Sequence, residues 1–139
     1  MATKHDIGIA TEIINQYEEK PELLVQVLHA FFDRYGFISE EAIRQIADEL
    51  NLSRADVHGV VSFYHDFRTT PPGKHVVKIC QAEACQAMGC RELTAHAERR
   101  LGVEMHNTTA NGDVSLEPVY CLGNCACSPA VMIDDKVYG

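Results

Sequence analysis

Residues 75–90 read HVVKICQAEACQAMGC and join an apolar, β-branched run to three evenly spaced cysteines. A short run of this composition predicts a β-strand, and Cys80 is its last residue. We place Cys85 in the loop that follows. Residues 91–101, RELTAHAERRL, then predict a helix that Gly102 ends. This order of strand, cysteine loop and helix decides the fold class of the second half of the chain.

Two more strands are predicted farther along the second half. The stretches DVSLEPVYC, residues 113–121, and PAVMID, residues 129–134, have the composition of strands. Asp134 and Asp135 predict a turn before the short stretch KVY. A strand, a helix and two further strands in this order indicate a small α/β or α+β domain.

The first half of the chain has the periodicity of helices. Apolar residues recur every three or four positions, which is the spacing of one helix face. The three stripes are Leu24, Leu28, Phe31 and Tyr35; Ile43, Ile46, Ala47 and Leu50; and Val57, Val60, Val61 and Tyr64. A weaker helix is expected from Ile7 to Tyr17, and Ser53 with Asp56 forms a capping pair. Shared burial of these stripes predicts a helical bundle.

The TTPPG stretch, residues 69–73, separates the two halves, because two prolines followed by glycine break regular structure. We therefore expect the fold class α+β with two domains. Residues 1–72 would form the helical bundle, which serves as scaffold or docking surface. Residues 73–139 would form the second domain.

The charge of the chain bounds its partners. It carries 12 Lys and Arg against 20 Asp and Glu, a net charge of -8 at pH 7. Residues 39–64 have the pattern of a helix-turn-helix, but they hold five acidic residues and two basic ones. Since a DNA-binding helix must neutralise phosphates, a regulator is disfavoured and no nucleic-acid partner is expected.

The sequence also bears on where the protein works. No segment reaches the roughly 18 apolar residues of a membrane span, and the first residues lack the apolar region of a secretory signal. We expect a cytoplasmic protein with no membrane partner. Cysteines are kept reduced in that compartment, which favours metal or redox chemistry over disulfides.

All six cysteines lie in the second half of the chain. Cys80 and Cys85 have four residues between them, Cys121 and Cys125 have three, and each pair is associated with the end of a predicted strand. Two such pairs can converge as one site of four thiolates. Gly123 lies inside the second pair and permits left-handed conformations that turn backbone N–H groups toward an anionic centre.

The spacing within each pair distinguishes between the groups that four cysteines could hold. Structural zinc takes four cysteines, most often with two residues inside each pair. Wider pairs suit a larger group, and a four-residue gap also opens the plant-type ferredoxin motif. The loops lack the histidines of a Rieske centre, and the C-x-x-C motif of a thioredoxin-type dithiol is absent. Spacing favours a [2Fe–2S] cluster and leaves a zinc-stabilised interaction domain or free thiols open.

Two cysteine stretches carry a family resemblance. CQAEACQAMG, residues 80–89, and EPVYCLGNCACSPAVMID, residues 117–134, closely resemble the thioredoxin-like [2Fe–2S] ferredoxin subunits of NADH-oxidising and NAD-reducing complexes. VHGVVSFYHDF, residues 57–67, resembles the stretch before their ferredoxin domain. These subunits occur in respiratory complex I, NAD-linked hydrogenases and formate dehydrogenases. The sequences CQAEACQ and CLGNCACSPAVM are together most similar to the gamma subunit of NAD-dependent formate dehydrogenase.

The resemblance implies a thioredoxin-like fold over residues 73–139 and one [2Fe–2S] cluster. It implies four iron ligands, Cys80, Cys85, Cys121 and Cys125. Cys90 and Cys127 lie outside the ligand pattern. Family members usually continue past the final residues DDKVYG with a short helix, so we expect a domain that is truncated at its C-terminus.

The implied function is one-electron transfer close to the FMN of a NAD-dependent formate dehydrogenase, with complex I or an NAD-linked hydrogenase as the alternative. The implied partners are a flavoprotein subunit that binds FMN and NAD, and a large subunit that holds molybdenum or tungsten. The sequence has no catalytic triad, phosphate-binding glycine loop or acid–base carboxylate pair. We therefore expect no catalytic residue in the chain itself.

Overall fold

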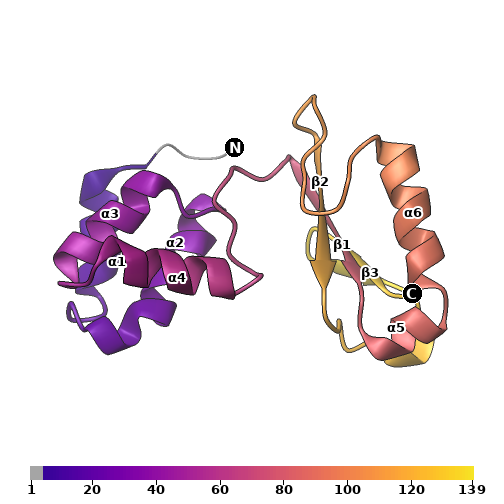
Figure 1. The fold of residues 1–139 in the computed structure, drawn as a ribbon, viewed down its shortest axis with the longest axis horizontal. Coiled ribbons are helices and arrows are strands. Elements are labelled where there is room, and N and C mark those ends of the chain that lie inside the picture. The colour runs from indigo at the N-terminus through magenta and orange to yellow at the C-terminus, as the bar shows by residue number, and fades with distance from the viewer. Residues whose placement is uncertain (1–4) are drawn as a thin grey trace. The chain divides into compact units, whose positions relative to one another are not determined.

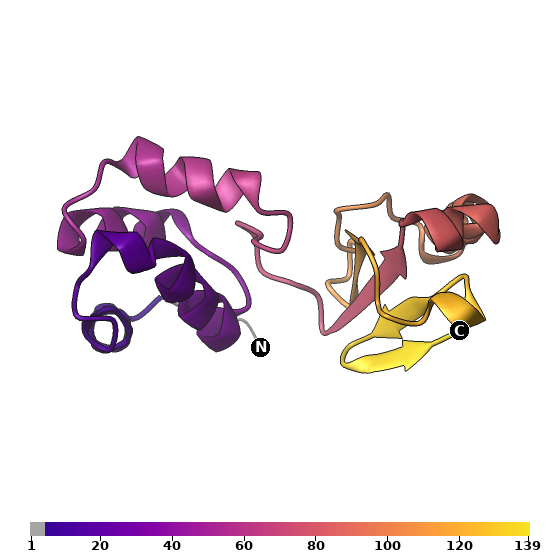
Figure 2. The same ribbon diagram turned by 90° about the horizontal axis from the view of Figure 1, so that it is seen from below.

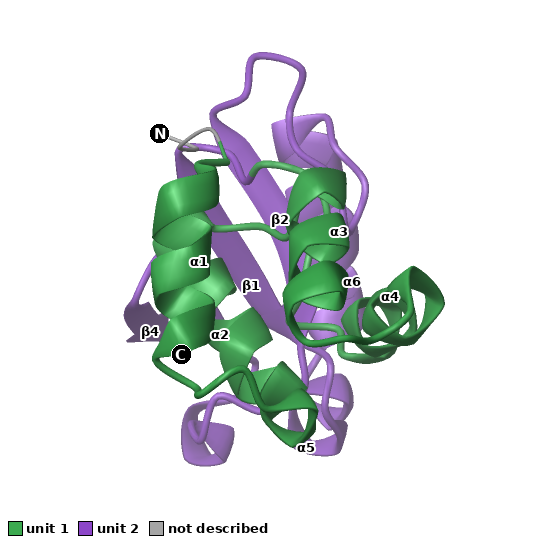
Figure 3. Ribbon diagram, turned by 90° about the vertical axis from the view of Figure 1, so that its left-hand side faces the viewer, with its two compact units in different colours: residues 1–71 green, residues 72–139 purple. Residues whose placement is uncertain are grey.

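The computed structural model describes residues 5–139 (Figure 1), and the chain divides into two compact units, Met1–Pro71 and Pro72–Gly139 (Figure 3). The division falls between the two prolines of the TTPPG stretch. Proline fixes its own backbone and disfavours helix at the residue before it. Two prolines in succession therefore prevent a helix from running across the boundary between the units.

The first unit is made of helices (Figure 1). Its elements are α1 (Ile7–Asn15), the short 3-10 helix η1 (Pro21–Leu23), α2 (Leu24–Tyr35), α3 (Glu40–Glu49) and α4 (Arg54–Phe63). Ser39 caps α3 by accepting a hydrogen bond from Ala42 N at 3.1 Å. Ser53 and Asp56 form the predicted capping box at α4. Gly36 ends α2 in the left-handed region, with φ of 77°.

One apolar core joins these helices. Its largest fully buried side chains come from all four α-helices and their connections: Ile14, Val27, Leu28, Phe31, Ile38, Ile46, Leu50 and Val57. The third predicted stripe is wrong at its last residue, since Tyr64 is 43% exposed. α4 ends at Phe63 and Tyr64 has extended backbone, so the helical spacing no longer applies there.

The second unit combines a four-stranded mixed sheet with helices (Figure 2). Its elements are β1 (His75–Cys80), α5 (Glu83–Ala87), α6 (Cys90–Leu101), β2 (Val114–Val119), the 3-10 helix η2 (Cys125–Cys127), β3 (Val131–Ile133) and β4 (Lys136–Tyr138). The strand order is β2-β1-β3-β4. β1 and β2 are parallel, whereas β3 pairs antiparallel with both β1 and β4.

α6 lies within the connection between the two parallel strands and runs beside the sheet (Figure 1). Two consecutive parallel strands need such a crossover, because the last residue of the first strand and the first residue of the second lie at opposite ends of the sheet. Ile79 of β1 and Leu116 of β2 are buried in one cluster with Leu93 and Ala97 of α6. The predicted strands and helix of the second half are thus present, although β2 ends at Val119, before the predicted end at Cys121. Within residues 5–139, no helix has the length and apolar character that crossing a membrane requires.

Candidate functional site

Both cysteine pairs lie at one end of the sheet. Cys80 and Val119 are the last residues of the parallel strands β1 and β2, and they are register partners. Cys80 N donates to Ala130 O at 3.0 Å, and Gln81 N donates to Val119 O at 2.8 Å. Cys121 follows Val119 by two residues, so the parallel register brings the second pair to the edge where the first pair begins.

The first pair is buried. Cys80 and Cys85 are each 2% exposed, and they pack with Cys90 and Ala130 against the half-buried Leu122. The prediction that Cys85 lies in a loop is wrong, because it lies on α5. Alanine, glutamate and glutamine in that segment are strong helix formers. The helix has only 5 residues, too few to produce a periodic pattern in the sequence.

The second pair is exposed. Cys121 Sγ and Cys125 Sγ are 3.8 Å apart, and Gly123 N donates to Cys121 Sγ at 3.3 Å. Gly123 has φ of 69°, so this loop uses the left-handed conformation that turns an N–H toward sulfur. The prediction that Cys121 ends a strand is wrong, since β2 ends at Val119. Cys125 begins η2.

One thiol of each pair, Cys85 and Cys125, has a shifted pKa, and the two shifts have opposite directions. A backbone hydrogen bond with Ala130 lowers the pKa of Cys85, against the opposing effect of burial. The pKa of Cys125 is raised by its hydrogen bond with Cys121 and by the charge of that residue. Burial and the charges of Cys85 and Cys80 raise it further. Four thiolates at this site therefore repel one another, and positive charge among them would relieve the repulsion.

The four predicted ligands form two pairs of donors. In the part of the chain that the structure describes, no three His, Cys, Asp or Glu side chains are gathered closely enough to hold a single metal ion. A [2Fe–2S] cluster takes four thiolates. The donor set of Cys80 with Cys85 and Cys121 with Cys125 fits that cluster in its chemistry.

The remaining two cysteines have different environments. Cys90 is fully buried at the start of α6, and its Sγ lies 3.9 Å from Gln81 Oε1. The pKa of Cys90 is raised by burial and then by the charges of Cys85 and Cys80, so this thiol keeps its proton. Cys127 is exposed on η2. Sequence reasoning missed the side-chain contacts of Gln81, because its partners on α6 meet it only in the folded domain.

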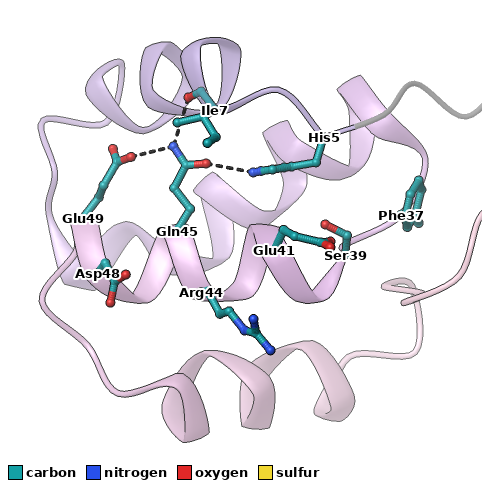
Figure 4. A pocket seen from close by; sticks show the side chains of 9 residues that line it. All are labelled: His5, Ile7, Phe37, Ser39, Glu41, Arg44, Gln45, Asp48 and Glu49. Carbon is teal, nitrogen blue, oxygen red and sulfur yellow. Dashed lines mark hydrogen bonds between the residues drawn. The ribbon is translucent and has the colours of Figure 1, made fainter.

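The helical unit has an open pocket of its own, in which Gln45 lies close to α1 (Figure 4). Gln45 Nε2 donates to Ile7 O at 3.0 Å and to Glu49 Oε1 at 2.6 Å, and His5 Nε2 lies 2.9 Å from Gln45 Oε1. Thr11 Oγ1 also donates to Glu49 Oε1, at 2.9 Å. The bonds from Gln45 to Ile7 O and from Thr11 to Glu49 therefore tie α1 to α3.

Comparison with known proteins gives a family and several relatives. The model of the family described as thioredoxin-like [2Fe–2S] ferredoxin matches residues 10–139. An NADH-quinone oxidoreductase subunit of Pseudomonas aeruginosa is 32% identical over 126 residues, which are 91% of this chain and 76% of that protein. The HndA subunit of the NADP-reducing hydrogenase of Solidesulfovibrio fructosivorans is 33% identical over 128 residues, 92% of this chain and 75% of that protein.

Solved structures resemble the chain in fold. The NAD+-reducing [NiFe]-hydrogenase in its air-oxidised state matches with a TM-score of 0.67 at 20% identity. The match covers 83% of this chain and 20% of the hydrogenase chain. The chain thus corresponds in fold to about a fifth of that larger polypeptide.

Proposed function

This chain belongs to the thioredoxin-like [2Fe–2S] ferredoxin family, and from that premise we propose that it is an electron-transfer subunit of an NADH-oxidising or NAD(P)+-reducing complex. Members of the family carry a single [2Fe–2S] cluster. The observation that carries the proposal is the likeness to subunits of such complexes, which runs along nine-tenths of the chain.

We propose Cys80, Cys85, Cys121 and Cys125 as the iron ligands. When bound, the cluster accepts and releases one electron at a time. The chain holds the first two thiols between the end of β1 and α5, and it orients the Gly123 amide toward the Cys121 sulfur. Hydrogen bonds to ligand sulfur and access of solvent are the protein's means of setting a cluster potential.

The exposed second pair leaves one side of the site open to a partner. Tyr120, directly before Cys121, is 60% exposed. Tyrosine is enriched at protein interfaces, so an exposed tyrosine beside exposed ligands suits a contact in which another protein covers the site and an electron crosses a short distance. We propose a flavoprotein subunit that binds FMN and NAD as that partner. The acidic helical unit would serve as a second docking surface.

The kind of complex is a further proposal. The relatives compared above are subunits of NADH-quinone oxidoreductase and of an NADP-reducing hydrogenase. Such a complex therefore replaces formate dehydrogenase as the leading candidate. The stretches CQAEACQ and CLGNCACSPAVM keep formate dehydrogenase, with its molybdenum- or tungsten-containing large subunit, as a specific alternative. A cytoplasmic location remains a prediction.

Purification of the chain under anaerobic conditions tests the function. We expect a red-brown protein with two irons and two sulfides per chain and a rhombic EPR signal after reduction. A colourless protein with one zinc ion would overturn the proposal. Affinity purification of the tagged subunit from its own cells, followed by mass spectrometry, identifies the complex. Recovery of a formate dehydrogenase large subunit would restore that alternative.

A further inference from the structure

Gln81 follows the first proposed ligand and bonds to four surrounding elements. We propose that Gln81 is a positioning residue that holds the first cysteine loop against β2 and α6, and thereby sets the lifetime and the electronic environment of the cluster. This proposal rests on the function proposed above.

The peptide groups of Gln81 are held on both sides. Its N–H donates to Val119 O of β2 at 2.8 Å, and its carbonyl oxygen accepts from Gln86 Nε2 of α5 at 2.7 Å. Cys80 directly precedes Gln81, and Cys85 directly precedes Gln86. The two bonds therefore fix the direction of the chain beside each thiol of the buried pair.

The side chain of Gln81 bonds to α6 and to β1. Its Nε2 donates to Thr94 Oγ1 of α6 at 3.0 Å and to Ile79 O of β1 at 3.3 Å. Its Oε1 lies 3.9 Å from Cys90 Sγ. An amide group has two N–H donors and one carbonyl acceptor, so each of these groups has a partner. The loop is thus attached to α6 through this one side chain.

Cys90 acquires a role in this arrangement. The thiol is fully buried, and its Sγ lies 3.9 Å from Gln81 Oε1, within reach for S–H to donate to that oxygen. It lies in the same buried cluster as Cys80 and Cys85. Cys90 therefore supports the side chain that orients the ligands, rather than binding iron itself.

Methionine is the substitution that isolates these bonds. It has nearly the length and shape of glutamine but no N–H donor and only a weak acceptor. In Gln81→Met the backbone bonds can persist, whereas Thr94 and Cys90 lose their partner. Gln26→Met is the matched control, because Gln26 is exposed on α2 in the helical unit.

The test uses the full chain, loaded anaerobically with iron and sulfide. We expect Gln81→Met to lose its visible absorption about fivefold faster than wild type in the presence of an iron chelator, as the loss of a hydrogen bond or two predicts. Its reduction potential and EPR g values should also shift. Gln26→Met should match wild type in all three measurements.

Thr94→Val tests whether the bonds act through Gln81. Alone, it should shorten the cluster lifetime, because it removes the acceptor by which the Gln81 amide is bonded to α6. Combined with Gln81→Met, it should add little, since residues of one network are not additive. Full additivity of the two substitutions would overturn the proposal.

The outcomes separate this proposal from the proposed function. If wild type takes up no [2Fe–2S] cluster, the function fails. If wild type takes it up and Gln81→Met matches its lifetime, potential and EPR spectrum, only the role of Gln81 fails, whatever the change in unfolding free energy. If Gln81→Met does not fold, Thr94→Val decides, and wild-type lifetime and spectrum in that variant would refute the role.

Discussion

The two cysteine pairs share one end of the sheet, but their surroundings differ. Cys80 and Cys85 are buried, whereas Cys121 and Cys125 are exposed. The pKa of Cys85 is lowered by a backbone hydrogen bond with Ala130, whereas the pKa of Cys125 is raised by its neighbour Cys121. Half of the proposed donor set is thus enclosed by the domain, and the other half faces outward, where a partner protein can reach it.

Loss of a proposed ligand has the largest expected effect on either pair. Cys85→Ser replaces a thiolate with a hydroxyl, which iron binds poorly. We expect it to abolish or severely alter the visible absorption and to lower the iron and sulfide content. Cys121→Ser should do the same from the exposed pair. Absorption, metal analysis and EPR after reduction measure both variants.

Cys90→Ser and Cys127→Ser are the controls for the ligand substitutions. Both should keep the visible absorption, because neither residue is a proposed ligand and serine at position 90 retains a donor for Gln81. If Cys90→Ser bleaches the protein while Cys85→Ser does not, the buried pair has been assigned to the wrong thiols.

Gly123→Ala perturbs the exposed pair through its backbone. No atom lies within 4 Å of an added Cβ, but the φ of 69° is unfavourable for alanine. We expect a loss of about 1–2 kcal/mol in the free energy of unfolding, measured in urea. Gly59→Ala on α4 also meets no atom within 4 Å, and its helical backbone predicts a gain instead. If both variants lost the same free energy of unfolding, the left-handed backbone of Gly123 could not be the cause.

Ser128→Ala tests the connection between the two pairs. Ser128 Oγ donates to Cys125 O at 2.6 Å, and Ser128 also hydrogen-bonds with Cys85. Loss of these bonds should cost about 1 kcal/mol in urea unfolding and shorten the cluster lifetime. Ser62→Ala is the control, because Ser62 is exposed on α4 and donates within that helix to Gly59 O at 3.1 Å. An unchanged cluster lifetime in Ser128→Ala would contradict the connection.

Asp134→Asn has the smallest expected effect, because it lies near the start of β1, away from the cysteines. Asp134 Oδ2 lies 2.9 Å from His75 Nδ1, and Val76 N donates to Oδ1 at 3.0 Å. Both bonds lower the pKa of Asp134, and the bond with His75 has the larger effect. A lowered carboxyl pKa gives stability that is complete above the ordinary value of about 3.9 and is lost as the pH falls through the folded-state pKa.

Urea midpoints of wild type and Asp134→Asn should therefore differ slightly at neutral pH and converge in acid. The cluster spectrum of the variant should equal that of wild type at neutral pH. A difference between the midpoints that stays constant from neutral to acid pH would show that the charge of Asp134 contributes nothing.

Local signals were predictable from the sequence because they depend on neighbouring residues. The capping box of Ser53 and Asp56 and the strand HVVKIC are confirmed at their expected places. The helix that carries Cys85 was not predictable, since its 5 residues show no periodicity. The exposure of Tyr64 was also missed, because a stripe does not reveal where a helix ends.

The site was predictable as a set of residues but not in its surroundings. Spacing and resemblance predict which four thiols act together, and this ligand set stays a prediction. The burial of Cys80 and the exposure of Cys121 depend on strand order, and the antiparallel pairing of β3 with β1 cannot be read from chain order. The contacts of Gln81 with Thr94 and Cys90 require α6 to be packed in place.

The parallel pairing of β1 with β2 determines when the site can form. Cys80 and Cys85 are neighbours along the chain, whereas Cys121 reaches them only after α6 has crossed over and β2 has paired. Such long-range contacts form slowly, because the intervening loop must first be closed. A nascent chain therefore leaves the ribosome with the first pair of thiols before the second, and the four proposed ligands can meet only once β2 has paired with β1.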